Sequence, residues 1–462
     1  MTISDVQKEI AAGKAVRTIV EEAITRAKAD PLNAVLTVIE KRALARADEI
    51  DKQKSQGTVT GRLAGVPFLA KDNILTFDSR TTASAHMLEN FIAPYQATVI
   101  ERLESEGAIC IGKTNLDAFA HGGSTENSYF GPTKNVADDE RVAGGSSGGS
   151  AVAVASGIVP FALGTDTGGS IRQPASYNGI YGLKPTYGSV SRYGVVAMAS
   201  STDVVGPLAT NLDDIQLVLD CMKGIDEYDS TTIDISPLET DTNKTLKIGV
   251  INQSMGEGVD PEVVEAIESK IKDAKKAGHD VTFVTLPSLS YALAVYYVVV
   301  PAELTSNLAR YDGIKYGEAK SAKDIAGVYT NTRTAGFMDE NKRRILIGNY
   351  VLSSGYYDAY YKKAQTVRTL IINEFKKAFE QCDVLVSPTA PTPAFKLGEN
   401  TDDPLQMYLA DIMTVPASLA GLPAINVPVG TTKAGLPIGM QIMAPMKKDY
   451  AVLRAAELWG DK

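Results

Sequence analysis

The amino-acid sequence predicts a layered α/β fold built around a mixed β-sheet. Short apolar segments of about four to eight residues, typical of buried strands, alternate along the chain with longer segments of helical periodicity. The composition, 44% hydrophobic and 22% charged, is that of an ordinary globular protein. With 462 residues the chain is long enough for two or three domains, although large α/β enzymes often form one.

The predicted helices are recognised from the spacing of their apolar residues and from the residues at their ends. Asp30 and Pro31 end the first helix, Gly107 ends a later one, and Asp260 followed by Pro261 begins another. Residues 302–382 are predicted to be mostly helical. The predicted helices cover residues 4–30, 40–52, 97–106, 261–278 and 357–381.

The predicted strands are short apolar runs between turn residues. Residues 424–429 and 438–443 flank the turn TTKAGLP, as the two strands of a hairpin do. The apolar segment 292–301 is typical of a buried helix or strand. The other predicted strands cover residues 66–70, 108–111, 159–164, 246–251 and 280–286.

Net charge and the scarcity of metal ligands argue against several functions. A net charge of −9 makes the chain a poor binder of a nucleic-acid backbone by itself, so a nucleic acid would need a second polypeptide to hold it. The three histidines and three cysteines have no spacing typical of a metal site or a disulfide framework. No apolar run has the length of a membrane span, and the N-terminus lacks the pattern of a signal peptide. We therefore expect a cytoplasmic location.

The segment 144–175 carries the strongest chemical signal. It contains GGSSGGS at 144–150 and GTDTGGSIRQPA at 164–175, separated by a predicted buried helix and strand. Glycine-rich turns allow backbone N–H groups to converge, and two hydroxyl-bearing loops around one strand suit the stabilisation of an oxyanion. Clusters of this composition also occur as linkers, but here they are embedded in apolar sequence.

Two shorter motif matches in this part of the chain do not fit their structural context. Residues 107–114, GAICIGKT, match the P-loop pattern, but the residues between its glycines are typical of a strand rather than of a phosphate-binding turn. Residues 144–148 match the nucleophile elbow of α/β-hydrolases. That elbow requires a preceding strand, whereas NVADDERVA at 135–143 is a charged loop and the one downstream histidine is His279.

The two glycine-serine motifs together resemble the signature of the amidase signature family of serine hydrolases. The resemblance runs from about residue 60 to the C-terminus. It implies one large domain over residues 1–462, with a central mixed sheet covered by helices on both faces. Residues 1–60 would be a helical N-terminal part of that domain, and residues 302–382 a mostly helical region within it.

The same resemblance implies a catalytic triad of two serines and a lysine. Ser170 matches the nucleophile, Ser146 the bridging serine that follows a cis peptide bond, and Lys71 the lysine in GVPFLAKDN at 65–73. Burial would lower the pKa of the lysine, which could then draw a proton from Ser146 as Ser146 draws one from Ser170. The reverse path would protonate the leaving amine. The expected oxyanion hole consists of the backbone N–H groups of Ser170, Thr167, Gly168 and Gly169.

Four further stretches are similar to the A subunits of tRNA-dependent amidotransferases, a branch of that family: residues 122–135, 306–317, 342–368 and 408–428. This similarity implies that the chain hydrolyses glutamine and that the ammonia passes to a partner subunit. The partner would use ATP and Mg²⁺ to convert Glu-tRNA(Gln) to Gln-tRNA(Gln), with no cofactor and no metal in this chain. The implied assembly is a heterotrimer with B-like and C-like subunits, in which the misacylated tRNA is bound mainly by a partner.

The similarity also implies a glutamine pocket. Arg344 would bind the α-carboxylate and Asp411 the α-ammonium group, with Tyr296 nearby. An arginine suits a carboxylate because its planar fork donates two parallel hydrogen bonds. Arg343 and Tyr297 are the adjacent alternatives. Before GGSTE, where many of these subunits carry methionine, the chain has His121.

Three hypotheses remain open at the level of the sequence. The first is the glutaminase subunit of a tRNA-dependent amidotransferase, acting on Glu-tRNA(Gln), Asp-tRNA(Asn) or both. The second is a free-standing amidase that acts on another small amide. The third is a scaffold subunit with a degenerate site, which the presence of all three triad residues disfavours.

Overall fold

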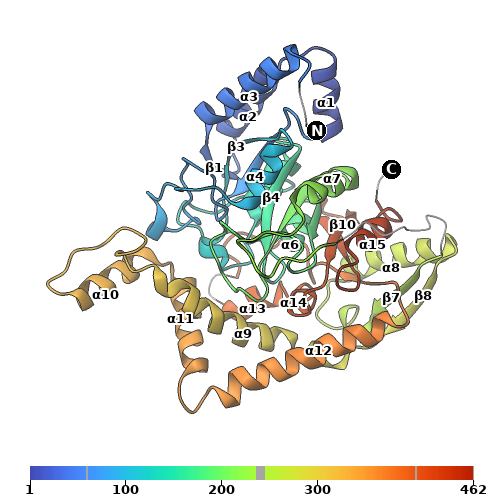
Figure 1. The fold of residues 1–462 in the computed structure, drawn as a ribbon. Coiled ribbons are helices and arrows are strands. Elements are labelled where there is room, and N and C mark those ends of the chain that lie inside the picture. Colours follow the sequence, from blue (N-terminus) through green and yellow to red (C-terminus); the bar gives the residue numbers. More distant parts are fainter. Residues whose placement is uncertain (59–60, 236–244, 401–402, 461–462) are drawn as a thin grey trace.

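A computed structural model describes residues 1–58, 61–235, 245–400 and 403–460 of the chain (Figure 1). Residues 59–60, at the end of the expected N-terminal part, lie outside the described residues. The described strands are β1 (Val35–Val38), β2 (Pro67–Lys71), β3 (Ile109–Thr114), β4 (Phe161–Asp166), β5 (Tyr181–Lys184), β6 (Val204–Ala209), β7 (Lys247–Ile251), β8 (Asp280–Val284), β9 (Val384–Pro388), β10 (Ala424–Thr431) and β11 (Pro437–Met443).

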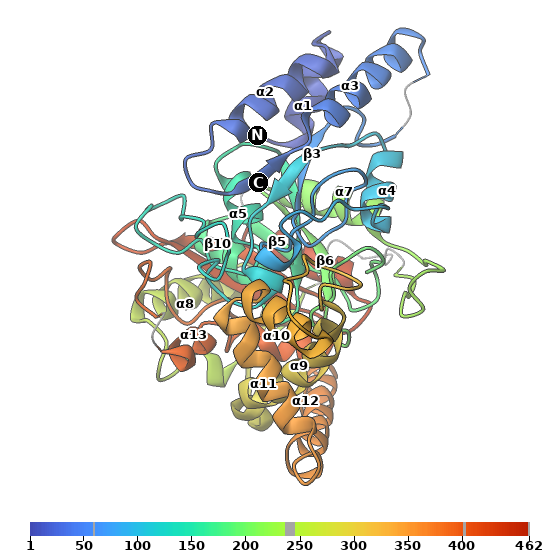
Figure 2. The same ribbon diagram turned by 90° about the vertical axis from the view of Figure 1, so that its left-hand side faces the viewer.

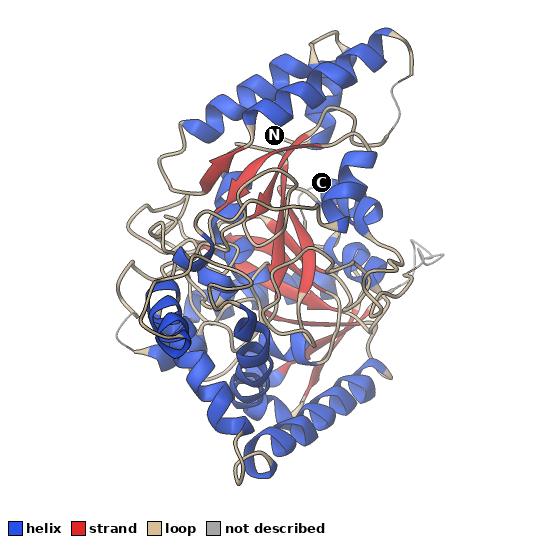
Figure 3. Cartoon of the chain, turned by 60° about the vertical axis from the view of Figure 1, so that its left-hand side comes forward, coloured by secondary structure: helices blue, strands red, loops and turns tan. Residues whose placement is uncertain are grey.

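These strands form a single mixed sheet of 11 strands in the order β1-β3-β2-β4-β6-β5-β10-β11-β9-β7-β8. The strands β3, β2 and β4 are mutually parallel, as are β9, β7 and β8, and the strands between these two groups pair antiparallel. The predicted hairpin is confirmed as β10 and β11. Figure 3 shows the sheet running through the centre of the molecule between the helices.

The α-helices are α1 (Ile3–Ala11), α2 (Val16–Lys28), α3 (Glu40–Ser55), α4 (Thr98–Ser105), α5 (Gly148–Ala155), α6 (Arg172–Tyr177), α7 (Leu212–Met222), α8 (Pro261–Lys276), α9 (Ala292–Asn307), α10 (Ile325–Gly336), α11 (Asp339–Leu352), α12 (Lys363–Phe379), α13 (Pro404–Leu409), α14 (Val415–Leu419) and α15 (Asp449–Ala456). In both Figure 1 and Figure 2, helices α1–α3 lie at one end of the molecule and α9–α12 at the other.

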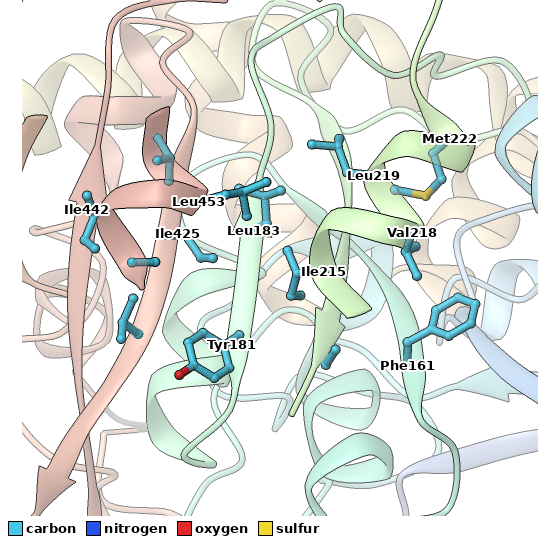
Figure 4. Packing of buried hydrophobic residues seen from close by; sticks show 14 of the residues in the cluster. Phe161, Tyr181, Leu183, Ile215, Val218, Leu219, Met222, Ile425, Ile442 and Leu453 are labelled. Carbon is cyan, nitrogen blue, oxygen red and sulfur yellow. The ribbon is translucent and has the colours of Figure 1, made fainter. Parts of the chain in front are cut away.

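Side chains that alternate along the strands show that helices cover both faces of the sheet. Phe68 and Phe161 pack with α4 and α7 in one hydrophobic cluster, whereas the neighbouring Leu69 and Ala162 pack with α2, α3 and α5 in another. This period of two is expected for strands buried on both faces. Figure 4 shows part of the first cluster, where Phe161 lies near Val218 of α7. The predicted α/β fold with a mixed sheet and two helical layers is confirmed.

The N-terminal region differs in two ways from the elements predicted by sequence. The single helix expected over 4–30 is two helices, α1 and α2, because Gly13 adopts a positive φ of 102° directly after α1. Residues 35–38, inside a region expected to be helical, form the edge strand β1 and pair antiparallel with β3. Its sequence, VLTV, consists largely of β-branched residues, which favour strands.

The helical region near residues 292–381 also departs in detail from expectation. The apolar segment 292–301 lies within helix α9, and the helix expected over 357–381 begins with a π-helical turn at Asp358–Lys362 before α12. By length and composition, the stretch Pro287–Arg310 could cross a membrane. Half of an apolar 18-residue segment within it, however, is buried inside the protein. Val299 and Leu304 of this stretch pack in a hydrophobic cluster with α12 and α14, as in a core helix.

Candidate active site

The site is built where the parallel strands β2 and β4 end side by side. Ala70 pairs with Leu163 in the register of the two strands, so Lys71 and Thr165 lie at the same edge of the sheet. Two loops meet there: residues 144–147, which precede α5, and residues 167–171, which connect β4 to α6. The peptide bond between Gly145 and Ser146 is cis. The two glycine-serine motifs and the strand that carries Lys71 are thereby brought together.

The amine of Lys71 is fully buried among hydroxyl groups. Its Nζ lies 2.8 Å from Ser146 Oγ, 2.8 Å from Ser147 Oγ and 2.9 Å from Thr165 Oγ1. Burial lowers the pKa of Lys71 from 10.5 to about 7. The negative charges of nearby buried aspartates, Asp117 among them, act in the opposite direction and raise this pKa. A substantial share of the Lys71 amine is therefore neutral at neutral pH.

The hydrogen-bond pattern determines which neighbour faces the lone pair of a neutral Lys71. The hydroxyl of Ser147 donates to the carbonyl of Thr165 over 3.1 Å, so its oxygen accepts from Lys71. The hydroxyl oxygen of Thr165 already accepts from Asn73 over 3.0 Å and can accept the second N–H of the amine. When both amine hydrogens are used in this way, the lone pair can face the hydroxyl of Ser146.

Ser170 lies in the second loop and is the most accessible of the three sequence-predicted triad residues. It is 8% exposed, whereas Lys71 and Ser146 are fully buried. Its carbonyl accepts a 3.1 Å hydrogen bond from the backbone N–H of Ser147, which ties the two loops together. Among the described residues, no hydrogen bond joins the hydroxyls of Ser146 and Ser170, so the structure shows the first link of the predicted relay but not the second.

The loop before Ser170 requires glycine at two positions. An added Cβ at Gly168 would approach Tyr296 to 2.6 Å, and Gly169 has a φ of 148° with Thr414 directly against it. The hydroxyl of Thr414 donates to the carbonyl of Gly168 over 2.6 Å. In the described part of the chain, no carbonyl or side chain accepts from the backbone N–H groups of residues 167–170. These N–H groups are unpaired there, and their role as the oxyanion hole stays a prediction.

A buried ion pair, to which no role was assigned from the sequence, holds this loop at both ends. Asp166 ends β4 and Arg172 begins α6, and their side chains form two hydrogen bonds of 2.9 and 3.0 Å. Burial alone would raise the pKa of Asp166, but the charge of Arg172 and its hydrogen bonds hold it below its usual value. Removing one partner of such a buried pair typically costs about 3–5 kcal/mol. Other contacts of the guanidinium are the carbonyl of Thr414 and the side chains of Ser418 and Gln441.

Two further buried residues hold backbone segments around Ser146 and were not singled out in the sequence. The side chain of Gln173 accepts from the backbone N–H of Gly145 over 2.9 Å and donates to the carbonyl of Gly123 over 2.7 Å. The carboxylate of Asp117 accepts from the N–H groups of Thr125 and Asn127, and burial raises its pKa to about 6. The adjacency of Gln173 to Arg172 in the motif was the only available signal.

A pocket of about 270 Å³ beside this centre contains Arg344. Arg344 is 3% exposed, and its Nε donates to Glu340 over 2.7 Å, while the guanidinium lies over the rings of Tyr297 and Tyr408. Its two terminal nitrogens donate to no other described residue, which leaves the fork available to a ligand. The neighbouring Arg343, the alternative left open by the sequence, lines the same pocket but is 45% exposed and pairs with Glu340.

The other two residues of the expected pocket, Asp411 and Tyr296, do not line this space themselves but contact residues beside it. The carboxylate of Asp411 lies against Gly123, about 3.5 Å from where a Cβ would stand, and burial raises its pKa to about 8. Tyr296 lies against Gly168 and meets Tyr297 edge to face, with ring centroids 5.2 Å apart. An aromatic path therefore connects the loop before Ser170 to Arg344. Within residues 1–58, 61–235, 245–400 and 403–460, no cluster of histidine, cysteine and acidic residues could hold a metal ion.

The arrangement matches a known class of enzyme. The sequence profile of the amidase family matches residues 18–453 of the chain. The chain belongs to the amidase family. The family's Ser-Ser-Lys chemistry accounts for a buried amine and two glycine-serine loops at one edge of a sheet, without any histidine.

The chain is also similar to individual members of this family. It is 51% identical over 432 residues to the glutamyl-tRNA(Gln) amidotransferase A subunit of Thermosynechococcus vestitus, covering 92% of this chain and 89% of that protein. The A subunit of the same enzyme from Caldanaerobacter subterraneus is 52% identical over 432 residues, covering 92% and 88%. The solved structure of the Thermotoga maritima A subunit superposes with a TM-score of 0.81 at 39% identity, over 99% of this chain and 94% of that one.

Proposed function

We propose that this amidase is the glutaminase subunit of a tRNA-dependent amidotransferase. It hydrolyses glutamine to glutamate and ammonia, and a partner subunit uses the ammonia and ATP to convert Glu-tRNA(Gln) to Gln-tRNA(Gln). The observation that carries the proposal is the buried amine of Lys71, 2.8 Å from the hydroxyl of Ser146, beside a pocket in which the fork of Arg344 is free. Relatives that bear the name of this kind of enzyme are about half identical to the chain over most of its length.

In this mechanism, Ser170 attacks the side-chain amide of glutamine. The neutral amine of Lys71 takes the proton of Ser146, and Ser146 takes the proton of Ser170 as the new carbon–oxygen bond forms. The tetrahedral oxyanion is bound by the free backbone N–H groups of residues 167–170. Lys71 then returns its proton to Ser146 as Ser146 gives one proton to the leaving nitrogen, so that ammonia departs and an acyl-enzyme remains, which water hydrolyses to glutamate.

The pocket supplies the groups that distinguish glutamine from other amides. The fork of Arg344 binds the α-carboxylate, and Asp411 binds the α-ammonium group. A bound ammonium group also lowers the raised pKa of Asp411, because an opposite charge favours the ionised carboxylate. Tyr296 closes the space between this pocket and the loop before Ser170.

We propose that B-like and C-like subunits complete a heterotrimer in the cytoplasm. The net charge of −9 supports an arrangement in which a partner, rather than this chain, holds the misacylated tRNA. ATP and Mg²⁺ bind to the partner and require no site here.

The test is reconstitution. The purified chain is combined with its B and C subunits, Glu-tRNA(Gln), ATP, Mg²⁺ and glutamine, and formation of Gln-tRNA(Gln) is measured. We expect glutamine-dependent product. Hydrolysis of a range of small amides by the chain alone, with no Gln-tRNA(Gln) in the complete mixture, would instead identify a free-standing amidase.

Replacing Arg344 with alanine is expected to raise the KM for glutamine about 10- to 100-fold, with a smaller change in kcat. Loss of a charge-assisted contact to the carboxylate weakens ground-state and transition-state binding alike. Steady-state ammonia release over a range of glutamine concentrations measures both constants. Arg343→Ala is the matched comparison: Arg343 lines the same pocket but is 45% exposed and pairs with Glu340, so its loss should raise the KM much less. A shift in KM for Arg343→Ala but not for Arg344→Ala would reassign the carboxylate site.

A further inference from the structure

His121 is a buried residue in the glutamine pocket to which the proposed mechanism gives no role. It directly follows the short helix η2 (Ala118–Ala120), is fully buried, and lines the same pocket as Arg344. Burial and the charge of Arg344 hold its pKa well below 6.5, so the ring is neutral at physiological pH. A neutral imidazole carries one N–H donor and one acceptor, and the neighbours decide which nitrogen is which.

Asn341 fixes the tautomer of His121. The side-chain oxygen of Asn341 accepts from the backbone N–H of Met338 over 3.1 Å, which identifies the opposite side of the amide as the NH₂ group. That NH₂ group donates to the carbonyl of Ala118 over 2.8 Å and lies 2.7 Å from His121 Nδ1. Because both of these backbone partners fix the orientation of the amide, it cannot be turned over. Nδ1 therefore accepts, and the hydrogen of the ring is on Nε2.

The Nε2–H group that results has no partner in the described part of the protein. His121 Nε2 is one of a few buried side-chain polar atoms without a hydrogen bond. A buried donor without an acceptor destabilises a folded protein, and in a native structure it calls for an explanation such as an absent ligand. Here the unpaired donor belongs to a side chain that lines the ligand pocket.

The chemistry of glutamine selects the group that this donor would bind. An N–H donor repels the α-ammonium group, which is itself a donor. The carbonyl oxygen of the amide is required at the N–H groups of residues 167–170, where the oxyanion develops. The α-carboxylate, which is expected at the fork of Arg344 in the same pocket, is the remaining acceptor.

We propose that His121 is a substrate-binding residue whose Nε2–H donates a hydrogen bond to the α-carboxylate of glutamine, alongside Arg344. This inference rests on the proposed glutaminase function and adds a second, neutral donor to the carboxylate site. Asn341 is the positioning residue that holds the donor on Nε2. Together, Arg344 and the Nε2–H group of His121 make the pocket selective for amides that carry a carboxylate.

The kinetic test compares two substrates that differ only in that carboxylate. In the complex with the B-like and C-like subunits, His121→Met should raise the KM for glutamine about 10-fold and change kcat less than about twofold. For 4-aminobutanamide, which is glutamine without its α-carboxylate, the wild type and the variant should have equal kcat/KM. His86→Met is the control, because His86 pairs with Glu89 outside this pocket. Equal losses for both substrates, or no loss for glutamine, would overturn the assignment.

A second measurement does not depend on turnover. The chain has three histidines, so ¹⁵N-histidine labelling of the Ser170→Ala protein gives few ring signals to assign. We expect His121 to show an unprotonated Nδ1 and an Nε2–H signal that shifts when glutamine, but not 4-aminobutanamide, is added. An Nε2–H signal that glutamine leaves in place would contradict the proposal. Failure of the wild-type complex to release ammonia from glutamine would contradict the proposed function itself, so the two failures are distinguishable.

Discussion

Replacing Ser170 with alanine is expected to abolish ammonia release from glutamine, by about 10⁴- to 10⁶-fold, and with it the glutamine-dependent formation of Gln-tRNA(Gln). No other hydroxyl replaces it, because Ser146 is fully buried and is engaged by Lys71. Folding should be unaffected, since the hydroxyl of Ser170 donates to no described residue and the backbone of the loop is held by Asp166 and Arg172.

Added ammonium chloride provides the control for this variant. Ammonia supplied directly bypasses the glutaminase step, so the complex that contains Ser170→Ala should still convert Glu-tRNA(Gln) at high ammonium concentration. A thermal melt within a few degrees of the wild type checks the fold. Retained ammonia release from glutamine would show that Ser170 is not the nucleophile, whereas loss of the ammonium-driven reaction as well would point to a failure of assembly.

Removal of the amine of Lys71 is expected to have the second large effect on activity. Lys71→Ala should lower kcat/KM for glutamine by about 10²–10⁴-fold, because no other base among the described residues is hydrogen-bonded to the hydroxyl of Ser146. Lys71→Arg should be similarly inactive, since a guanidinium keeps its proton at any working pH. In the wild type, with a pKa of about 7 for Lys71, the protonated form prevails below that pH and cannot accept a proton. Activity should therefore fall as the pH drops below about 7 and level off above it.

Lys184 provides the control for the pH profile. It is also fully buried, burial lowers its pKa to about 7, and its amine donates to the carbonyl of Pro185 rather than to the triad. Lys184→Met should keep the acidic limb of the profile if that limb belongs to Lys71. An acidic limb that disappears in Lys184→Met would show that Lys184, and not Lys71, is its source. For both lysines the unfolded chain holds the extra proton between about pH 7 and 10.5, so their contribution to stability rises with pH over that window.

Much of the fold could be predicted because its strands and helices have strong local signals. The hairpin of β10 and β11 has a turn that contains glycine and proline, and α8 begins with Asp260 and Pro261, which its structure uses as cap and first residue. The strands β1, β5, β6 and β9, four to six residues long, were missed, although the predicted strands β2, β7 and β8 are no longer than five residues. Strands of this length are stabilised by their pairing within the sheet rather than by local propensity, and that pairing is not visible in one sequence.

For the site, the residues proposed to have a direct chemical role could be named from the sequence, whereas those that hold them in place could not. Lys71 and Ser170 lie in motifs whose composition is unusual. Arg172 and Gln173 lie in the same motif as Ser170, but their partners are reached only through the fold. The tautomer of His121 likewise depends on Asn341, more than 200 residues away, and no spacing in the sequence announces such a contact.

The buried guanidinium of Arg172 has a consequence for engineering. It contacts Asp166, which supports the loop of the nucleophile, and also Thr414 and Ser418, which follow the proposed ammonium ligand Asp411 closely in the chain. The segment that recognises the substrate and the loop that reacts with it are therefore clamped to one charge. A segment around Asp411 grafted from a related enzyme must therefore keep the contacts of Thr414 and Ser418 with Arg172, because the same guanidinium also supports the loop of Ser170.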